Sequence, residues 1–431
     1  MRMKSKTYYV SSLNGNDNAD GLTADSPFLT LKKINELSLC PGDKVLLENG
    51  SVFDKQFLHL KDCGDINDKA IEIGAYGDGD YPPCINTDGE GVWYQDYGNP
   101  LDNPNHVYKG NVSSSILLYD AENITVRDIE ITNREEYTTH EAYIAVDKMD
   151  RTGVAVVAQN RGTLHSITLE NLFIHDVNGN VYNKHMNNGG IYITAFKPAD
   201  ESATGVARYD GVTVKGCCVR NVSRWGIAVG YTYKANEFAT KYLEIDTFKK
   251  YGNENITISE NYVKEAGGDA ITPMYALCPT VEHNTADSCA TEMNDRYYRY
   301  AGKRMGKVAA AIWPWKCKDA LLMFNDCVDT KLNQDGMAYD ADSGDGTRYE
   351  YNYSRANEGG CIMFCLQEAV NNTFVHNVSY KDLGGIVTPS KNPDAYIAEN
   401  EFYILKGVPF RRSRNHGKMT LKNNKITHIE K

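Results

Sequence analysis

Apolar and polar residues alternate in short runs along most of the chain, and one type of run recurs. It begins at an aliphatic or aromatic residue, as in Ile124–Ile131, Ile167–Ile174 and Val212–Val219. A period of two places the apolar side chains on one face of a β-strand, so most of these runs predict strands. The pattern continues at Ile256–Val263, Leu321–Val328, Tyr349–Tyr353, Phe374–Val378, Ile397–Phe402 and Leu421–Ile426.

A second type of segment, a small residue followed by an apolar run, comes after most of these strands. Each repeat is therefore predicted to have at least two β faces. Seven segments align on the small residue: Asn188–Phe196, Trp225–Thr232, Gly268–Tyr275, Ala309–Trp315, Asp335–Asp342, Gly359–Leu366 and Gly384–Lys391. In this alignment Asp342 lies opposite Phe196, Thr232, Tyr275, Leu366 and Lys391, and Asp340 lies opposite Thr194, Gly230, Pro273, Phe364 and Pro389. Ala309–Trp315 fits in either of two registers, one residue apart.

The spacing of asparagines gives the length of the repeat. Asn352, Asn377, Asn400 and Asn424 follow one another at steps of 25, 23 and 24 residues. Such a step corresponds to one turn of a parallel β-helix, in which two or three short strands form each coil. Asparagine at a fixed corner predicts an inward ladder whose amides bond one coil to the next.

We therefore predict an all-β chain folded as a right-handed parallel β-helix, one domain over residues 1–431 with regular coils over 119–431. Residues 7–50 predict an N-terminal cap: Ser26 and Pro27 begin a helix whose apolar stripe closes the open end of the solenoid. Longer steps between strands place loop insertions near 233–253 and 276–307, and Asn294–Arg304 has a helical pattern. Loops on one side of a solenoid commonly wall a binding cleft.

The formal net charge of −11 argues against nucleic acid or an anionic membrane as a partner, because both need a basic face. It also weighs against a polyanionic substrate. No apolar run approaches the ~18 residues of a membrane span, and the basic start Met1–Lys6 is not followed by the apolar core of a signal peptide. The expected location is cytoplasmic, although a shortened form of a secreted protein would look the same.

The 11 cysteines follow no disulfide or zinc spacing, and several, including Cys361 and Cys365, are interpreted as small buried hydrophobic residues. Phosphate-loop, dinucleotide and metalloprotease motifs are absent from the sequence. Asp340, Asp342 and Asp345 resemble the start of a calcium-binding loop, but Tyr351 occupies the position of the essential glutamate. The sequence therefore predicts no metal and no cofactor, while a calcium site of another type stays open.

Three aspartates break the repeat. Asp340 and Asp342 project to the same face of one predicted strand, and Asp335 lies at the corner before it. Two carboxyl groups across one cleft are what glycoside hydrolysis needs, one to protonate the leaving oxygen and one to attack or to activate water. The alternative is that these are turn or surface residues, which we favour for Asp345 beside its two glycines.

Aromatic residues near this rung are candidates for stacking on sugar rings. Trp313 and Trp315 share one face of the preceding rung, either on the acids' side or in the core, depending on the register. Trp225, Asp269 and Tyr275 are further candidates on the same wall, with core or turn packing as the alternative.

Two sets of motifs resemble known families. The N-terminal elements Tyr8–Ser11, Gly15–Asp17, Gly21, Ser26–Phe28 and Pro41–Asp43 resemble the opening of many right-handed β-helix carbohydrate-active proteins. The block Asp335-x-x-Ala-Tyr-Asp340-x-Asp342, with Tyr351–Ser354 and Asn357–Gly360, resembles the active-site rung of the lacto-N-biosidase β-helix family of glycoside hydrolases.

In that family two aspartates seven residues apart act as acid/base and nucleophile with retention of configuration. The resemblance assigns these roles to Asp335 and Asp342. Members are often preceded by a helical folding-partner domain, so the resemblance also implies a helical partner, either as a domain or as a separate subunit.

The leading hypothesis is a retaining glycosidase acting on a neutral oligosaccharide that contains N-acetylhexosamine and galactose. A second is a lyase or epimerase of uronates, for which Arg348, Lys316 or Lys391 would abstract the proton. A third is a glycan-binding solenoid without catalysis.

Overall fold

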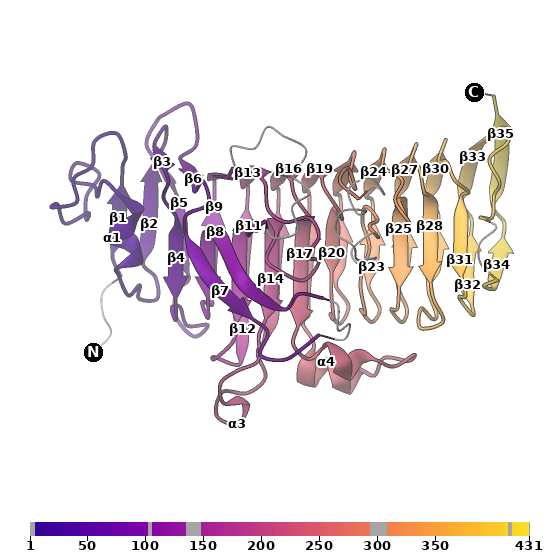
Figure 1. Cartoon of the computed structure of the whole chain (residues 1–431), viewed down its shortest axis with the longest axis horizontal. Coiled ribbons are helices and arrows are strands. Elements are labelled where there is room, and N and C mark those ends of the chain that lie inside the picture. Colours follow the sequence, from indigo (N-terminus) through magenta and orange to yellow (C-terminus); the bar gives the residue numbers. More distant parts are fainter. Residues whose placement is uncertain (1–4, 102–105, 135–147, 294–307, 413–415, 431) are drawn as a thin grey trace.

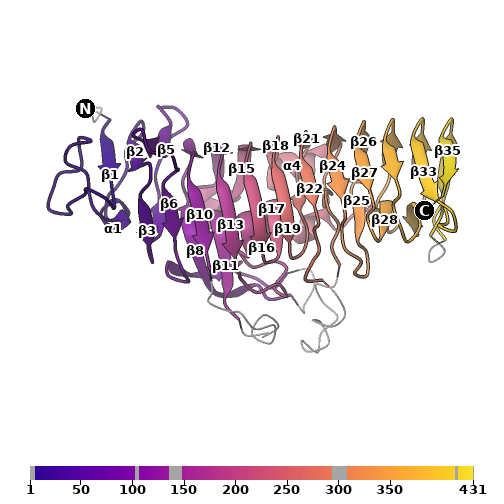
Figure 2. The same ribbon diagram turned by 90° about the horizontal axis from the view of Figure 1, so that it is seen from above.

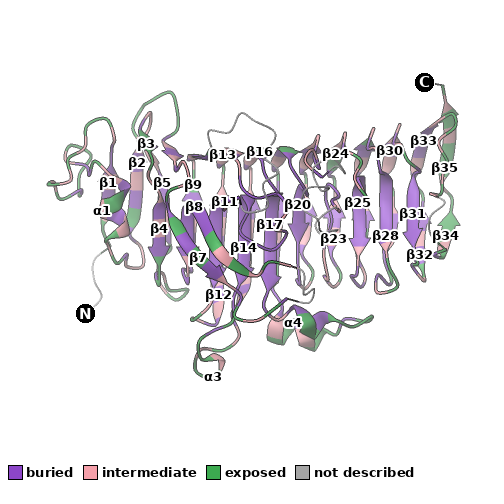
Figure 3. Ribbon diagram, in the orientation of Figure 1, coloured by how far each residue is buried: buried purple, intermediate pink, exposed green. Residues whose placement is uncertain are grey.

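The chain forms a long parallel β-helix whose coils stack from the N-terminal to the C-terminal end (Figures 1 and 2). This computed structural model describes residues 5–101, 106–134, 148–293, 308–412 and 416–430. Three parallel sheets run along the solenoid, and Figure 3 shows that many residues of their strands are buried. Buried apolar side chains from these strands form one continuous core. The predicted fold class is confirmed. No helix in the described ranges combines the length and hydropathy needed to cross a bilayer.

The first sheet has 13 strands, and neighbours in it pair in parallel. In order they are β1 (Thr7–Val10), β2 (Lys44–Glu48), β5 (Ile71–Tyr76), β9 (Ile124–Arg127), β12 (Thr163–Glu170), β15 (Arg208–Lys215), β18 (Glu254–Ser259), β21 (Thr280–Glu282), β23 (Leu321–Met323), β26 (Arg348–Glu350), β29 (Thr373–Val375), β32 (Ala395–Ala398) and β34 (Met419–Lys422).

The second sheet has 12 strands in the same arrangement. They are β3 (Val52–Asp54), β6 (Cys84–Asn86), β10 (Glu130–Asn133), β13 (Phe173–Val177), β16 (Cys218–Val222), β19 (Tyr262–Ala266), β22 (Thr285–Asp287), β24 (Asp326–Val328), β27 (Tyr353–Arg355), β30 (Val378–Tyr380), β33 (Glu401–Leu405) and β35 (Lys425–Ile429).

The third sheet is divided. Its longer part contains β4 (Leu58–Lys61), β8 (Lys109–Tyr119), β11 (Asp150–Ala158), β14 (Gly189–Ala195), β17 (Trp225–Thr232) and β20 (Ile271–Pro273), with β7 (Val92–Asp96) antiparallel to β8. Its shorter part contains β25 (Met337–Asp342), β28 (Gly360–Cys365) and β31 (Val387–Ser390). Between them the Ala309–Trp315 rung makes only isolated bridges. Pro314 lies within it, and proline has no N–H to donate to a strand ladder.

Most of the predicted alternating runs are two strands rather than one. Ile256–Val263, for example, contains β18 and β19, which belong to different sheets. The chain turns between them at Glu260, whose φ is 58°. Left-handed backbone breaks the regular alternation at the corner, and an inward asparagine follows it.

The corner asparagines form the predicted ladder, and it is longer than expected. Side-chain amides link Asn261, Asn284, Asn325, Asn352, Asn377, Asn400 and Asn424, each donating to the carboxamide oxygen of the next at 2.9–3.1 Å. Each of these oxygens also accepts from a backbone N–H of the preceding asparagine, as Asn377 does from Asn352 at 2.7 Å. The ladder thus satisfies buried polar groups at a corner where the sheets cannot.

The N-terminal cap differs from the prediction. Helix α1 covers only Leu31–Asn35, and its N-cap is Thr30, not Ser26. Phe28 instead bridges Val10 as extended chain. The expected apolar stripe is nevertheless buried, because Leu31 and Ile34 have no exposed surface. The segment caps the core mainly through its side chains.

The insertions were only partly predicted. Residues 233–253 leave the coils and contain the 3-10 helix η1 (Ala235–Phe238) and α4 (Ile245–Tyr251), near α3 (Glu201–Thr204) on one side of the solenoid (Figure 1). Residues 276–307 are not one insertion, because β21 and β22 form a further coil within them. The helix expected at Asn294–Arg304 lies outside the described residues.

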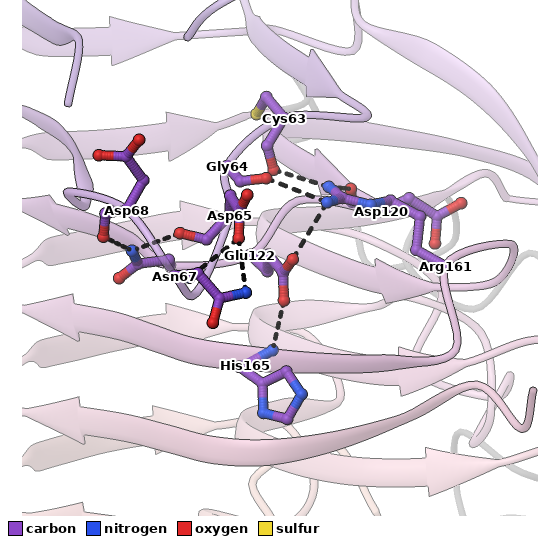
Figure 4. A network of polar contacts seen from close by, with 10 residues as sticks. Cys63, Gly64, Asp65, Asn67, Asp68, Asp120, Glu122, Arg161 and His165 are labelled. Atoms are coloured by element: carbon purple, nitrogen blue, oxygen red, sulfur yellow. Dashed lines mark hydrogen bonds and ion pairs between the residues drawn. The ribbon is translucent and has the colours of Figure 1, made fainter. Parts of the chain in front are cut away.

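Arg161 links neighbouring coils in the N-terminal part of the solenoid through hydrogen bonds (Figure 4). The Arg161 guanidinium donates to the backbone oxygens of Cys63, Gly64 and Asp120 at 2.9–3.0 Å and to Glu122 Oε1 at 3.1 Å. Gly64 has a φ of 84°, and a Cβ there would lie 1.7 Å from the Glu122 backbone oxygen. Only glycine therefore allows this loop to approach the next coil so closely.

We predict that Asn377→Ala lowers the free energy of unfolding by roughly 2–4 kcal/mol, because it leaves the buried backbone N–H and side-chain amide of Asn352 without their acceptor. Denaturant unfolding measures the change. The matched control is Asn236→Ala, which alters an exposed residue in η1. Equal effects in the two variants would contradict a stabilising role for the ladder.

Candidate active site

The acids lie in one row of the third sheet, in a register different from the predicted one. Asp342 pairs with Cys365, which pairs with Ser390, and Trp315 bridges Asp342 from the preceding rung. The alignment had placed Leu366 and Lys391 opposite Asp342, one residue too far along the chain. It matched Gly336 with Gly360, but Gly336 is a corner residue with a φ of 79°, and Met337 is the residue that pairs with Gly360.

A pocket of about 480 Å³ opens over this row. Asp335, Asp342, Cys365, Ser390 and Arg412 all line it. Its remaining lining residues are Val308, Gln334, Met363, Leu366, Thr388 and Lys391. The corner residue Asp335 and the strand residue Asp342 therefore reach the same pocket, as the glycosidase hypothesis requires.

Asp335 and Asp342 have different electrostatic surroundings. Burial and the Asp342 carboxylate raise the pKa of Asp335 to about 7, against the opposing charges of Lys184 and Arg412. Burial also raises the pKa of Asp342, but the Ser343 hydroxyl, which donates to it at 2.6 Å, and the charges of Lys184 and Lys316 act in the other direction. Near neutral pH this favours a proton on Asp335 and a carboxylate at Asp342.

Asp340 lies deeper than the other two acids and is only 4% exposed. Burial, followed by the charges of Asp342 and Asp335, raises the pKa of Asp340 well above its usual range. Its Oδ1 is fully buried and has no hydrogen-bond partner among the described residues. A neutral carboxyl group is therefore the favoured form at this position.

Lys184 is the buried cation that the sequence reading missed. Its ammonium lies 4.7 Å from the ring centroid of Trp315, 5.3 Å from that of Trp313 and 6.0 Å from that of Trp225. Its charge lowers the pKa of all three acids. The loop that carries Lys184 has no repeat pattern, so no sequence signal indicated its position.

The two tryptophans adopt the register that faces the acids, since Ile312 bridges Tyr339 and Trp315 bridges Asp342. Trp315 is partly exposed and is surrounded by His185, Tyr231, Tyr275 and Trp313 at ring-centroid distances of 5.4–6.0 Å. Trp313 is 4% exposed, and its indole N–H donates to Asp269 Oδ1 at 2.9 Å. Trp315 is therefore the better placed of the two to meet a ligand.

The other predicted binding residues lie behind this wall. Asp269 and Trp225 have no exposed surface, and Tyr275 is 1% exposed. Asp269 pairs with the buried Arg224 at 3.0 Å and accepts from Trp313, while the Trp225 indole donates to the Lys184 backbone oxygen at 2.7 Å. These residues hold the tryptophans and Lys184 in place and do not face open space. The strand pattern placed these residues on the same face as Trp315. It could not show that they are buried beneath other side chains, because those side chains come from segments outside the repeat.

Asp345 and Arg348, the next two charged residues considered from the sequence, form ion pairs within the protein. Asp345 is not a surface turn residue: it is 5% exposed, pairs with Lys318 at 3.1 Å and accepts the Leu243 N–H from the helical insertion at 3.1 Å. Arg348 lies in β26 of the first sheet beside Glu350. Cys365, interpreted from sequence as a buried hydrophobic residue, is partly exposed and lines the pocket.

We predict that Asp335→Asn stabilises the fold at alkaline pH and not at acidic pH. The pKa of Asp335 rises from an ordinary value of 3.8 to about 7 on folding, so the wild type loses stability as pH increases between these values, by at most about 4 kcal/mol. The variant has no such loss. Thermal unfolding of both proteins from pH 4 to pH 8 tests this.

The control for this experiment is Asp25→Asn, at an exposed position in the N-terminal loop, which should track the wild type throughout. An Asp335→Asn curve parallel to that of the wild type at every pH would show that Asp335 is not desolvated on folding.

Comparison with known proteins identifies similar chains. A curated protein named lacto-N-biosidase, from Bifidobacterium longum subsp. longum, is 41% identical over 97% of this chain, and the chain spans 28% of that protein's length. Crystal structures of GH136 lacto-N-biosidase from Eubacterium ramulus, in native and selenomethionine forms, superpose with a TM-score of 0.95 at 58% identity. The match covers 98% of this chain and 68% of the Eubacterium chain. No protein-family model matches.

Proposed function

Because the chain belongs to the GH136 lacto-N-biosidase family, we propose that it is a retaining glycosidase acting on neutral oligosaccharides that contain N-acetylhexosamine and galactose. The observation that carries the proposal is the pairing of Asp335 and Asp342 in one pocket, with surroundings that favour a proton on the first and a charge on the second. Retaining glycosidases need one carboxyl group of each kind.

In the proposed mechanism the protonated Asp335 donates its proton to the glycosidic oxygen as the bond to the anomeric carbon breaks. Asp342 attacks that carbon from the opposite face and forms a glycosyl ester. Asp335, now a carboxylate, removes a proton from water, which attacks the anomeric carbon and releases the sugar with its original configuration. Lys184 supports the ionised state of Asp342 through its nearby charge.

Asp340 does not line the pocket surface with the other two acids, and we propose a supporting role for it. A neutral carboxyl group can donate a hydrogen bond to a substrate or to a neighbouring carboxylate. The charges of Asp342 and Asp335 add to burial in keeping the pKa of Asp340 high. Asp340 thereby stays neutral and adds no second negative charge beside Asp342.

The proposed substrate class rests on the composition of the walls. Trp315 presents an indole surface beside the acid row, and aromatic rings suit the apolar faces of sugars. Hydroxyl groups of Thr388 and Ser390 lie on the other side of the acids. Such a wall suits uncharged sugars with many hydroxyl groups. The helical partner implied by the family resemblance stays a proposal, tested by whether a helical partner from a relative binds the purified chain.

Product analysis tests the reaction class. The purified protein is incubated with β-linked oligosaccharides terminating in galactosyl–N-acetylglucosamine units, and the products are separated by chromatography. Release of a saturated disaccharide supports the proposal. An unsaturated, ultraviolet-absorbing product would indicate a lyase, and binding without any product would indicate a glycan-binding solenoid.

We predict that the two acids respond differently to the leaving group. Asp335→Ala should lose roughly 10²–10⁴-fold in rate on natural oligosaccharides but much less on an aryl glycoside, whose leaving group needs no protonation. Asp342→Ala should lose activity on both substrates. Azide should rescue both variants on the aryl glycoside, giving a glycosyl azide of retained configuration from Asp335→Ala and of inverted configuration from Asp342→Ala.

The wild-type rate should also fall as pH rises through about 7, where Asp335 loses its proton, and this limb should be absent from Asp335→Ala on the aryl glycoside. The control is Asp326→Asn, an exposed residue of β24, which should match the wild type. Equal sensitivity of both substrates to the loss of Asp335 would exclude it as the acid.

A further inference from the structure

Two pocket residues, Asp342 and Cys365, form a set of donor atoms with the deeper Asp340 that hydrolysis does not use together. One atom each from Asp340, Asp342 and Cys365 lies within 4.8 Å of the other two. The sheet produces this arrangement, because Asp340 and Asp342 share one face of β25 and Cys365 is the partner of Asp342 on β28. The triangle is therefore fixed by two adjacent strands and not by a mobile loop.

A separate observation points to a missing partner at this position. The Oδ1 atom of Asp340 is completely buried and lacks a hydrogen-bond partner within the described ranges, and the residue is 4% exposed. A buried carboxyl oxygen without a partner is costly, because it loses its water without compensation. The supporting role proposed for Asp340 in hydrolysis gives this oxygen no partner among the described residues while the pocket is empty.

We propose that Asp340, Asp342 and Cys365 bind one thiophilic divalent cation of the zinc class, and that the bound cation inhibits the enzyme. Zinc takes thiolate at about 2.3 Å and carboxylate at about 2.0–2.2 Å, commonly with three protein ligands and one open position. Donor atoms up to 4.8 Å apart need to close by at most about 1.4 Å for each pair to meet this geometry.

The charges that face the site favour a divalent ion over a monovalent one. Burial keeps protons on Asp340 and Cys365 in the metal-free protein, and a bound cation would displace them. Two carboxylates and a thiolate would then carry three negative charges beside the one positive charge of Lys184. A divalent cation would bring this group of four residues to neutrality. The thiol ligand disfavours calcium and magnesium, because both ions prefer oxygen ligands.

The inhibition rests on the proposed function, whereas the binding does not. An Asp342 oxygen bound to the cation cannot attack the anomeric carbon, so occupancy would stop the first step of hydrolysis. Removal of the cation by a chelator should restore activity in full, because no covalent bond of the protein changes.

Cadmium provides the test, since a cadmium–thiolate bond gives an ultraviolet charge-transfer band. Titration of the purified chain with Cd²⁺ is compared between the wild type, Cys365→Ser, Asp340→Asn and Cys278→Ser. Cys278 is an exposed cysteine outside the pocket and serves as the matched control. Circular dichroism confirms that each variant is folded.

In the wild type and in Cys278→Ser we expect the charge-transfer band to saturate at one tightly bound Cd²⁺ per chain. Cys365→Ser should give no such band, and Asp340→Asn should bind Cd²⁺ at least about tenfold more weakly. Excess Ca²⁺ or Mg²⁺ should not displace the metal, whereas Zn²⁺ should. Identical titrations of the wild type and Cys365→Ser would overturn the site.

Hydrolysis assays with Zn²⁺ then separate the two proposals. Inhibition reversed by chelator in the wild type, and reduced at least tenfold in Cys365→Ser, supports the inhibitory role. A Cys365-dependent band with no effect of Zn²⁺ on turnover would overturn that role. A band in a protein that cleaves no oligosaccharide would leave the metal site standing and refute the proposed function.

Discussion

The stacking of each coil on the next in a fixed register is the constraint on which the rest of the structure depends. Inter-strand hydrogen bonds set the spacing, but a parallel strand that slips by one residue reverses the face of every side chain. The asparagine ladder opposes such a slip, because each amide must meet both a backbone oxygen and the next amide. The coil that carries the acids lies between Asn325 and Asn352, inside this ladder.

Given that register, the pocket follows from the order of side chains along one row. Trp315, Asp342, Cys365 and Ser390 occupy successive coils at the same position of the third sheet. The row brings an aromatic surface, a carboxylate, a thiol and a hydroxyl together along the solenoid axis. Insertion loops cover its N-terminal side and supply Lys184. Burial of three acids in this space destabilises the fold at neutral pH, and active sites commonly carry such a cost to stability.

The sequence predicted the repeating architecture and the two acids of the pocket, but not the exact register of the third sheet or the contacts made between distant segments. The β-helix, the inward asparagines and the shared pocket of Asp335 and Asp342 followed from periodicity and from the family resemblance. The register failed by one residue because glycine was taken as a strand position at Gly336, where it forms the corner. Lys184 lies on a loop without a pattern, and the burial of Asp269 depends on Arg224, a contact between residues distant in sequence.

The central claim is that Asp342 forms a covalent bond to the sugar, and trapping that intermediate tests it most directly. The protein is incubated with the 5-fluoro glycosyl fluoride of a galactosyl–N-acetylglucosamine disaccharide, digested at low pH and mapped by peptide mass spectrometry. Our account predicts one glycosyl ester, located on Asp342. An ester on any other residue, or complete turnover to product of inverted configuration without an adduct, would contradict it.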